Sequence, residues 1–223
     1  MKKKICVLIP SYNEERAIGG IVKSLRGRGF TTYVVDDGST DKTAEFAAAE
    51  GAVVVQHKVN KGKGASMREG FSHILKRGFE LVVVMDGDNQ HEVEDIDAFI
   101  SRMENTGADM VVGNRMHDIT LMPSERVHTN RFMSALISMI SGQKVPDTQC
   151  GFRLIKTSLL ESIRLESSNY EIESEMIIRA AKKGYRIESV PIKTIYRDEK
   201  SCINPVLDTL RFFYFLIKVS LKP

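Results

Sequence analysis

Several residue types are scarce or missing from this chain of 223 residues, and each absence argues against a class of protein. Tryptophan is absent and aromatic residues make up only 7%, which argues against a surface that stacks nucleic-acid bases. The net charge is only +3 and gives no argument for nucleic-acid binding. The cysteines are odd in number and far apart. We therefore expect no disulfide framework, no zinc site, and a reducing, cytoplasmic compartment.

Long apolar runs are also missing. No run reaches the roughly 20 residues that a transmembrane helix needs. The lysines at positions 2–4 precede the apolar run Ile5–Ile9, but this run is too short for the core of a signal peptide and ends at Pro10. We therefore interpret it as a first strand. The remaining composition, 42% hydrophobic and 27% charged, is typical of a globular protein.

In the first half of the chain, apolar runs alternate with segments of helical periodicity. The runs predict strands at 5–9, 31–35, 52–55, 81–85 and 110–113. The segments between them predict helices, the first capped by Asn13 and ending near Arg26, the others ending near 50, 76 and 103. Such alternation is typical of a parallel sheet with right-handed crossovers. We therefore predict an α/β fold.

The second half of the chain is less regular. Residues 117–127 are predicted as a polar loop, followed by a helix at 129–140, a strand at 148–155, a helix at 171–183, a strand at 185–192 and an apolar helix at 206–221. Neither an internal repeat nor a low-complexity linker divides the chain. We therefore expect residues 1–223 to form a single domain.

Polar side chains follow three strands of the first half, in the segments 12–14, 36–37 and 86–88. Asp86 and Asp88 are so close in sequence that they repel each other unless a cation or a proton lies between them. Carboxylate oxygens are hard ligands that suit Mg²⁺ or Mn²⁺. Because the carboxyl ends of parallel strands form the ligand cleft of open α/β sheets, we predict a metal-dependent site there. The alternative is that Asp and Gly simply favour turns.

Five short motifs, each at the end of a predicted strand, together resemble those of family 2 glycosyltransferases. They are Ile9-Pro10-Ser11-Tyr12-Asn13-Glu14, Val34-Val35-Asp36-Asp37-Gly38-Ser39-Thr40-Asp41, Asn60-Lys61-Gly62-Lys63-Gly64, Asp86-Gly87-Asp88-Asn89-Gln90-His91 and Gly113-Asn114-Arg115. Within the family, the chain is similar to the branch of dolichyl- and polyprenyl-phosphate mannosyl- and glucosyltransferases. The resemblance covers nearly the whole chain. It implies a GT-A fold with a Rossmann-like, mostly parallel central sheet flanked by helices, a nucleoside diphosphate sugar as donor, and inverting transfer.

The resemblance also implies roles for particular residues. Asp86, Asp88 and Gln90 would hold Mg²⁺ or Mn²⁺ against the donor diphosphate. Asp88 and Arg115 are the expected catalytic residues, Arg115 as a fixed positive charge on donor phosphate or sugar. The expected substrate and nucleotide contacts are Pro10, Tyr12, Glu14, Val35, Asp37, Asp86, Gly87, Asp88, Arg115, Arg126 and Arg197. We interpret the lysines at 61 and 63 as solvated, whereas the glycines beside them could offer backbone N–H groups to phosphate.

The acceptor decides whether a general base is needed. A lipid phosphate is already ionised near neutral pH and needs none, whereas a sugar hydroxyl needs a carboxylate to take its proton. Glu171, Glu173 and Glu175 are candidates, although acidic residues also favour a first helical turn for other reasons. The chain departs from the lipid-phosphate branch at Cys202, where that branch has lysine. Transfer to a sugar or glycan hydroxyl therefore stays open as an alternative.

The expected partners follow from the two halves of the chain. Residues 1–115 are predicted to bind the nucleotide sugar, and residues 116–223 to form an acceptor half that binds a lipid phosphate. The segment 211–222 combines aromatic and basic residues, so it could lie peripherally at the inner face of a membrane, pack on the core or form a homodimer contact. A second alternative is a non-catalytic module that binds nucleotide sugars. A dehydrogenase is disfavoured because no Gly-x-Gly-x-x-Gly follows the first strand.

Overall fold

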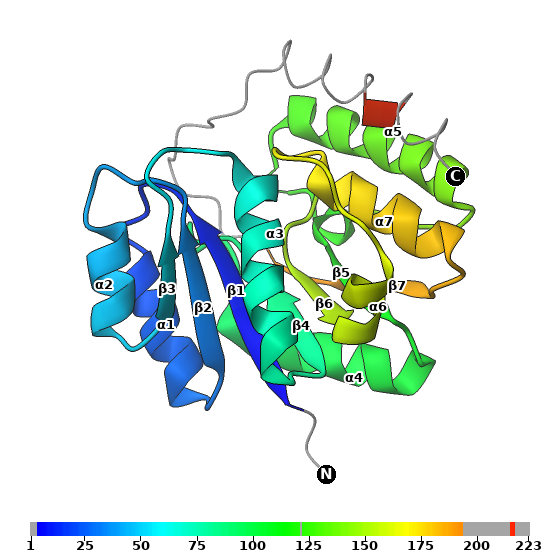
Figure 1. The fold of residues 1–223 in the computed structure, drawn as a ribbon. Coiled ribbons are helices and arrows are strands. Elements are labelled where there is room, and N and C mark those ends of the chain that lie inside the picture. Colours follow the sequence, from blue (N-terminus) through cyan, green and yellow to red (C-terminus); the bar gives the residue numbers. More distant parts are fainter. Residues whose placement is uncertain (1–3, 121, 194–214, 217–223) are drawn as a thin grey trace.

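A single seven-stranded sheet forms the centre of the computed structural model, which describes residues 4–120, 122–193 and 215–216. The strands lie in the order β3-β2-β1-β4-β6-β5-β7 (Figure 1). Only β6 runs antiparallel to its neighbours, β4 and β5. The predicted α/β fold with a mostly parallel central sheet is therefore confirmed. The strands are β1 (Ile5–Ser11), β2 (Thr31–Asp36), β3 (Val53–Gln56), β4 (Leu81–Val84), β5 (Met110–Asn114), β6 (Arg153–Lys156) and β7 (Ile187–Pro191).

Helices flank this sheet. The α-helices are α1 (Ile18–Gly27), α2 (Thr43–Ala49), α3 (Lys63–Ile74), α4 (Ile96–Thr106), α5 (Ser124–Ser141), α6 (Thr157–Ser162) and α7 (Ile172–Lys182). Short 3₁₀ turns are η1 (Leu75–Arg77), η2 (Val93–Asp95) and η3 (Arg115–His117). In Figure 1, α3 lies beside β1 at the front of the sheet. It packs with β1 and β2, and α5 packs against α7. Within the described residues, no helix combines the length and apolarity needed to cross a membrane.

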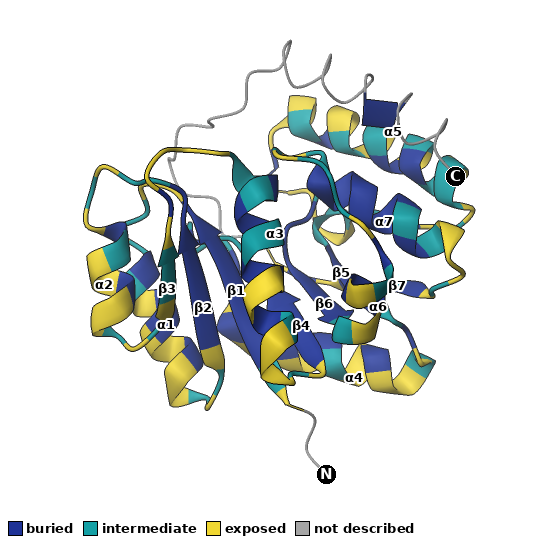
Figure 2. Cartoon of the chain, in the orientation of Figure 1, coloured by how far each residue is buried: buried dark blue, intermediate teal, exposed yellow. Residues whose placement is uncertain are grey.

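The core lies along the central strands. Every residue of β4 is buried, as are all residues of β1 after Ile5, which explains why these runs are continuously apolar rather than alternating. Figure 2 shows the same contrast, with dark central strands and exposed outer faces on α1 and α2. The packing of α3 on β1 is close, because a side chain at Gly70 would collide with Leu8. Burial of this kind fixes the positions of the strand ends.

Three predicted boundaries were wrong. The first helix begins at Ile18 rather than after Asn13, because Asn13 adopts a positive φ of 57° and its side chain accepts from the Thr40 N–H at 2.9 Å. Helix α5 begins at Ser124, inside the predicted polar loop. Of the strand predicted at 148–155, only the part from Arg153 onward is a strand, β6. The residues before it form the wall of the site described below.

Two further expectations concern the end of the chain and the division into halves. The helix predicted at 206–221 falls mostly outside the described residues, of which Phe215 and Leu216 are helical and buried. Strand β6, from the predicted acceptor half, lies between β4 and β5 from the predicted donor half. The two predicted halves therefore share one sheet.

Candidate active site

The carboxyl ends of β1, β2 and β4 meet at one edge of the sheet. Ser11 pairs with Asp36 in the β1–β2 register, and the Asp37 N–H donates to the Ser11 carbonyl at 2.8 Å. The Met85 N–H donates to the Leu8 carbonyl at 3.1 Å, which holds the residue before Asp86 beside β1. The polar segments at positions 12–14, 36–37 and 86–88 therefore start from adjacent strand ends, as the strand-end rule predicts.

Asp86 lies in a cluster with Lys63 and Glu173. The Lys63 ammonium is 2.6 Å from Asp86 Oδ1 and 2.8 Å from Glu173 Oε1, while His91 Nε2 is 3.7 Å from Asp86 Oδ2. Burial opposes the charge on Asp86, but Lys63 and then His91 outweigh it and hold the pKa of its carboxyl well below the usual range. Burial likewise opposes the charge on Lys63, but Asp86 and Glu173 outweigh it and raise the pKa of its ammonium. The interpretation of Lys63 as a solvated side chain was wrong, since only 17% of that side chain is exposed.

Asp88 is the second member of the acidic pair. Burial and then the charge of Asp86 raise the pKa of its carboxyl above the ordinary value. Within the described part of the chain it receives one hydrogen bond, from the Gln90 N–H at 3.0 Å. Asn89 between them has a positive φ of 58°, which turns the backbone back towards Asp88. The two aspartates are thus in different electrostatic environments, one paired with an ammonium and one destabilised as an anion.

The surroundings of this pair fit a divalent cation. An ammonium already lies against Asp86. Burial and then the charge of Asp86 raise the pKa of Asp88, a cost that a bound cation would relieve. Three buried polar atoms of residues near the pair lack a hydrogen-bond partner within the described ranges. They are Ser11 Oγ, His91 Nδ1 and Glu173 Oε2. The described residues contain no ready cluster of three His, Cys, Asp or Glu ligands. The predicted ligand set has only two such residues, Asp86 and Asp88, and its third ligand is the Gln90 amide.

A buried arginine builds the wall behind Asp86. Arg153 is completely buried and donates to the carbonyls of Thr148, Cys150 and Glu173 at 2.7–2.9 Å. This arrangement holds the segment 148–151 against Asp86 so closely that a Cβ at Gly151 would lie 2.5 Å from Asp86 Oδ2. Sequence reasoning missed this role and assigned the segment to a strand. The available signal was a charged residue in the middle of the apolar run Phe152–Ile155.

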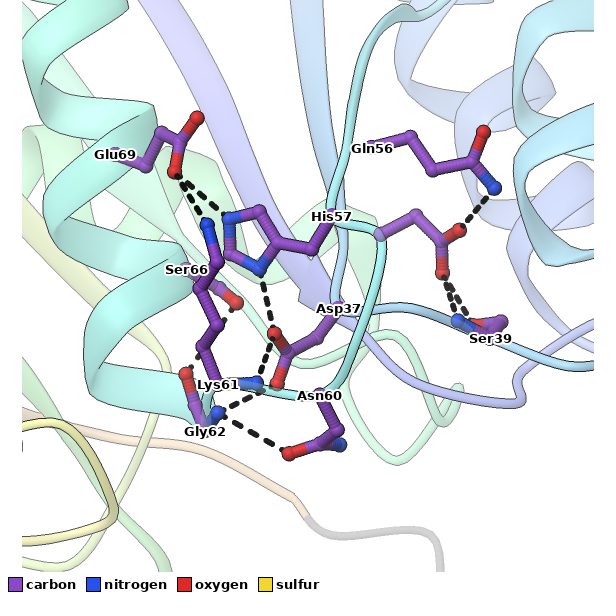
Figure 3. Close-up of polar contacts among 10 residues, drawn as sticks. Asp37, Ser39, Gln56, His57, Asn60, Lys61, Gly62, Ser66 and Glu69 are labelled. Carbon is purple, nitrogen blue, oxygen red and sulfur yellow. Dashed lines mark hydrogen bonds and ion pairs between the residues drawn. The ribbon is translucent and has the colours of Figure 1, made fainter.

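Asp37 is bound from several sides (Figure 3). Its Oδ1 lies 2.6 Å from His57 Nδ1 and accepts from the Lys61 N–H at 2.9 Å, and its Oδ2 accepts from the Gly62 N–H at 2.8 Å. A carboxylate has about four acceptor positions, so one on Oδ2 is left for a ligand. The neighbouring Asp36 is fully buried and accepts from Gln56 and Ser39. Sequence reasoning identified Asp37 but gave no indication of its link to His57.

Arg115 follows β5 and is held by Asp147. Its Nε and one terminal nitrogen donate to the two Asp147 oxygens at 2.7 and 2.9 Å, and its backbone N–H donates at 3.1 Å. Asp147 is completely buried. The bidentate pair fixes the orientation of the guanidinium.

The other predicted site residues occupy different environments. Pro10 and Val35 are buried in their strands, and Tyr12 is 43% exposed beyond β1. Glu14 is half-buried and its N–H donates to Thr43 Oγ1 at 2.7 Å. Arg126 is half-buried in α5, and Arg197 lies outside the described residues, as does Cys202.

The three candidate bases at the start of α7 are now distinguishable. Both oxygens of Glu175 accept backbone N–H groups of residues 166–167, and Oε1 also accepts from Arg179. Glu173 is 3% exposed, with Oε1 on Lys63 and Oε2 without a partner within the described chain. Glu171 precedes the first turn of α7. Glu173 therefore belongs to the Asp86 cluster through Lys63, whereas Glu175 binds residues 166–167 and Arg179 instead.

This fold and strand-end site define the GT-A class of glycosyltransferases. The sequence profile described as "Glycosyl transferase family 2" matches residues 6–164. The chain therefore belongs to glycosyltransferase family 2, as its motifs predicted, and is a glycosyltransferase. The resemblance to the dolichyl- and polyprenyl-phosphate branch is also confirmed, because relatives whose names specify these lipid phosphates match most of the chain at 29% identity.

Two relatives and one solved structure illustrate the similarity. Protein MJ1222 of Methanocaldococcus jannaschii is 36% identical over 88% of this chain and 84% of its own length. The UDP-N-acetylglucosamine–dolichyl-phosphate N-acetylglucosaminyltransferase of Methanococcus voltae is 29% identical over 98% of this chain and 97% of its own. Glucosyl-3-phosphoglycerate synthase from Mycobacterium tuberculosis was solved with Mn²⁺, uridine diphosphate and glucosyl-3-phosphoglycerate. It matches all of this chain and 81% of its own with a TM-score of 0.75 at 22% identity, which supports the shared fold.

Proposed function

We propose that the chain is a metal-dependent, inverting glycosyltransferase that moves a hexose from a nucleoside diphosphate sugar to a polyprenyl or dolichyl phosphate. The observation that carries the donor half of this proposal is the Asp86–Asp88 pair at the carboxyl end of a buried strand, in which Asp86 contacts an ammonium and the pKa of Asp88 is raised. The acceptor half is supported by the Methanococcus voltae relative, whose name specifies dolichyl phosphate.

The donor would bind along the strand ends. Asp86, Asp88 and Gln90 would hold Mg²⁺ or Mn²⁺, and the ion would offset the charge of the leaving diphosphate. Asp37 can accept one more hydrogen bond, which suits a base N–H or a ribose hydroxyl. Pro10, Tyr12, Glu14 and Val35 would line the nucleotide pocket, with Gly87 allowing close approach of the backbone. The Mycobacterium tuberculosis structure with uridine diphosphate and Mn²⁺ supports this class of ligand.

The acceptor would approach from the side of α5 and α7. Arg115, fixed by Asp147, would contact the donor phosphate or sugar, and Arg126 and Arg197 would contact the acceptor phosphate. An ionised phosphate oxygen can attack without a general base, so the protein needs only to desolvate and align it. Such an acceptor resides in a membrane, and we propose a peripheral position at the inner face, in the cytoplasm. A vesicle-flotation assay tests this, and sedimentation equilibrium tests the proposed homodimer.

Two measurements test the proposed reaction. Thermal unfolding with UDP, GDP and their sugars, each with Mn²⁺ or with chelator, should show a metal-dependent rise for one nucleotide, since a ligand bound only to the folded state stabilises it. Transfer of that sugar should then occur to a phosphorylated prenol and not to the unphosphorylated prenol. Binding without transfer to either prenol would contradict the lipid-phosphate acceptor while keeping the donor.

A specific feature of Glu173 favours a second candidate function. Its Oε2 is buried and without a partner within the described residues, and its Oε1 contacts Lys63 at the Asp86 cluster. A carboxylate in that position could take the proton of a hydroxyl, so transfer to a sugar or glycan hydroxyl is the alternative. Glu173→Gln distinguishes the two acceptors. Transfer to a phosphate should persist in this variant, whereas transfer to a hydroxyl should fall by about 10²-fold or more.

A further inference from the structure

His57 occupies an unusual position immediately after β3. It is 4% exposed, and its ring lies between two carboxylates (Figure 3). Nδ1 is 2.6 Å from Asp37 Oδ1, and Nε2 is 2.8 Å from Glu69 Oε2 on α3. The backbone N–H of His57 donates to the Asp36 carbonyl at 2.9 Å, which fixes the backbone that carries the ring.

Two short contacts to carboxylates require two donors on one ring. A neutral imidazole carries one N–H, so it can donate to Asp37 or to Glu69 but not to both. Carboxyl groups ordinarily give up their protons more readily than imidazolium does. The hydrogen bond from His57 lowers the pKa of Glu69 further. The other charged side chains that face this group are Lys61, 3.8 Å from Glu69 Oε2, and His73, whose charge acts on Glu69. The arrangement is therefore that of an imidazolium between two carboxylates.

The contacts of Asp37 extend from this ring to a loop. The carboxylate that His57 holds also accepts the backbone N–H groups of Lys61 and Gly62. The same loop has no room to shift towards its neighbours. A Cβ at Gly38 would lie 2.7 Å from the Val59 backbone, and one at Gly62 would collide with the Ser168 carbonyl. The orientation of the Asp37 carboxylate thus sets the positions of two backbone N–H groups directly before α3.

The charge of the His57 ring matters because the neighbouring site would bind an anion, the diphosphate of the donor. Asp36 and Asp37 bring two buried carboxylates to the edge of the sheet where the donor would bind, and the anionic donor meets their repulsion. A positive charge on His57 offsets Asp37 from inside the protein, where screening by salt is weak. Lys61 cannot replace it, because half of that side chain is exposed and its ammonium lies near Glu69 rather than Asp37.

We propose that His57 is a positioning residue for donor binding. Clamped as an imidazolium between Asp37 and Glu69, it fixes the carboxylate that organises residues 60–62 and offsets charge beside the diphosphate. The proposal rests on the proposed function in naming a nucleoside diphosphate as the ligand. Its effect should appear in the KM for the donor rather than in kcat, because His57 touches neither the acidic pair nor the reacting atoms.

The first experiment compares His57→Gln with His73→Gln. His73 lies on α3 and is exposed, so it provides a matched control of the same residue type. The His57 variant should raise the donor KM, and the Kd of the nucleotide with Mn²⁺, by about tenfold, as expected for losing about 1.4 kcal/mol of binding free energy. Its kcat should stay within about threefold, and His73→Gln should change neither quantity. Equal donor KM values in the two variants would overturn the proposal.

Chemical rescue separates the charge from the packing of the ring. In His57→Ala, added imidazole should restore the donor KM, because its cation can donate to Asp37 and Glu69 together. Pyrazole has nearly the same shape but stays neutral and donates only once, so it should fail. Equal rescue by both rings would show that only the volume matters and would overturn the proposal.

A measurement without donor keeps this test independent of the proposed function. Amide hydrogen exchange of Lys61 and Gly62 in the ligand-free protein should be faster in His57→Gln than in wild type and His73→Gln. If wild type binds neither UDP nor GDP, the proposed function fails, yet faster exchange at these two amides still supports the positioning role. Unchanged exchange in His57→Gln would overturn it whatever the donor.

Discussion

Two carboxylate clusters lie at the same edge of the sheet, and they are built differently. Around Asp37, three donors from His57, Lys61 and Gly62 converge on one carboxylate. Around Asp86 and Asp88, one carboxylate contacts an ammonium while the pKa of the other is raised, and buried polar atoms nearby lack partners within the described residues.

This difference indicates that the Asp37 cluster stabilises the structure around it, whereas the Asp86–Asp88 cluster is suited to binding a ligand. A carboxylate with several protein donors contributes to the stability of the loop that supplies them. A carboxylate pair with a raised pKa and orphaned neighbours is costly to the folded protein, and such costs are typical of functional sites. We therefore expect substitutions in the first cluster to affect order and donor affinity. Substitutions in the second should affect turnover.

The largest expected effect is that of Asp88→Asn. Transfer should fall by at least about 10²-fold, because the variant loses an anionic ligand for the cation that would stabilise the leaving diphosphate. Unfolding should not become easier. The pKa of this carboxyl is raised in the folded protein. The folded protein therefore loses stability as the pH rises from the pKa of the unfolded state through that of the folded state, and asparagine removes this cost. A transfer assay and a thermal melt check both parts, and near-normal transfer would exclude Asp88 from the metal site.

Lys63→Met tests whether a metal ion can replace the Lys63 ammonium in neutralising the charge of Asp86. Removal of the cation leaves Asp86 and the buried Glu173 unpaired, which should lower the free energy of unfolding by roughly 3–5 kcal/mol. Mn²⁺ should then stabilise the variant more than it stabilises wild type. Urea unfolding with Mn²⁺ and with chelator measures both effects. Equal stabilisation by Mn²⁺ in the two proteins would contradict the idea that the cluster accepts either cation.

The pH dependence of metal binding should follow Asp88. An unperturbed aspartate has a pKa of about 3.9, and burial together with Asp86 raises the pKa of Asp88 above this value. Protonation removes the ligand, so the affinity for Mn²⁺ should begin to fall, as the pH is lowered, at a higher pH than for an ordinary carboxylate. Calorimetric titration of Mn²⁺ between about pH 4 and 7, with circular dichroism to verify folding, checks this. A pH-independent affinity over that range would contradict it.

The smallest effect is expected for Gln56→Ala, which lies beside the first cluster and contacts Asp36 rather than Asp37. The exposed Gln56 side chain donates to Asp36 Oδ2 at 2.9 Å. Because Asp36 keeps its bonds from Ser39, the loss should cost about 1 kcal/mol of unfolding free energy. Donor affinity should remain unchanged, in contrast to His57→Gln. A tenfold loss of donor affinity would mean that Asp36, and not only Asp37, organises the donor side.

The strand-end pattern could be predicted from the sequence because it depends on local properties. Continuous apolar runs predicted the buried strands, and the residues directly after them predicted which side chains would meet at the sheet edge. The motif spacing similarly identified the family. These inferences need no knowledge of which distant segments come into contact.

The remaining parts of the site depend on contacts between distant segments. Lys63 and Glu173 are 2.8 Å apart in space but lie on α3 and α7, and the pairing of His57 with Asp37 spans two strand ends. The insertion of β6 between β4 and β5 is another such contact. It explains why Arg153 is buried at the wall of the site rather than exposed. The helix start at Ile18 differed for a local reason, the left-handed conformation of Asn13.

The position of β6 also bears on how the chain folds during its synthesis. One edge of β4 and one edge of β5 are completed only by β6, whose residues 153–156 follow both strands by a long stretch of sequence. Until the ribosome has released them, both strands present unpaired backbone N–H and C=O groups, a template for association with other chains. Residues 1–115 therefore cannot complete the sheet alone. The central sheet is complete only once the segment that also forms the wall behind Asp86 has been synthesised.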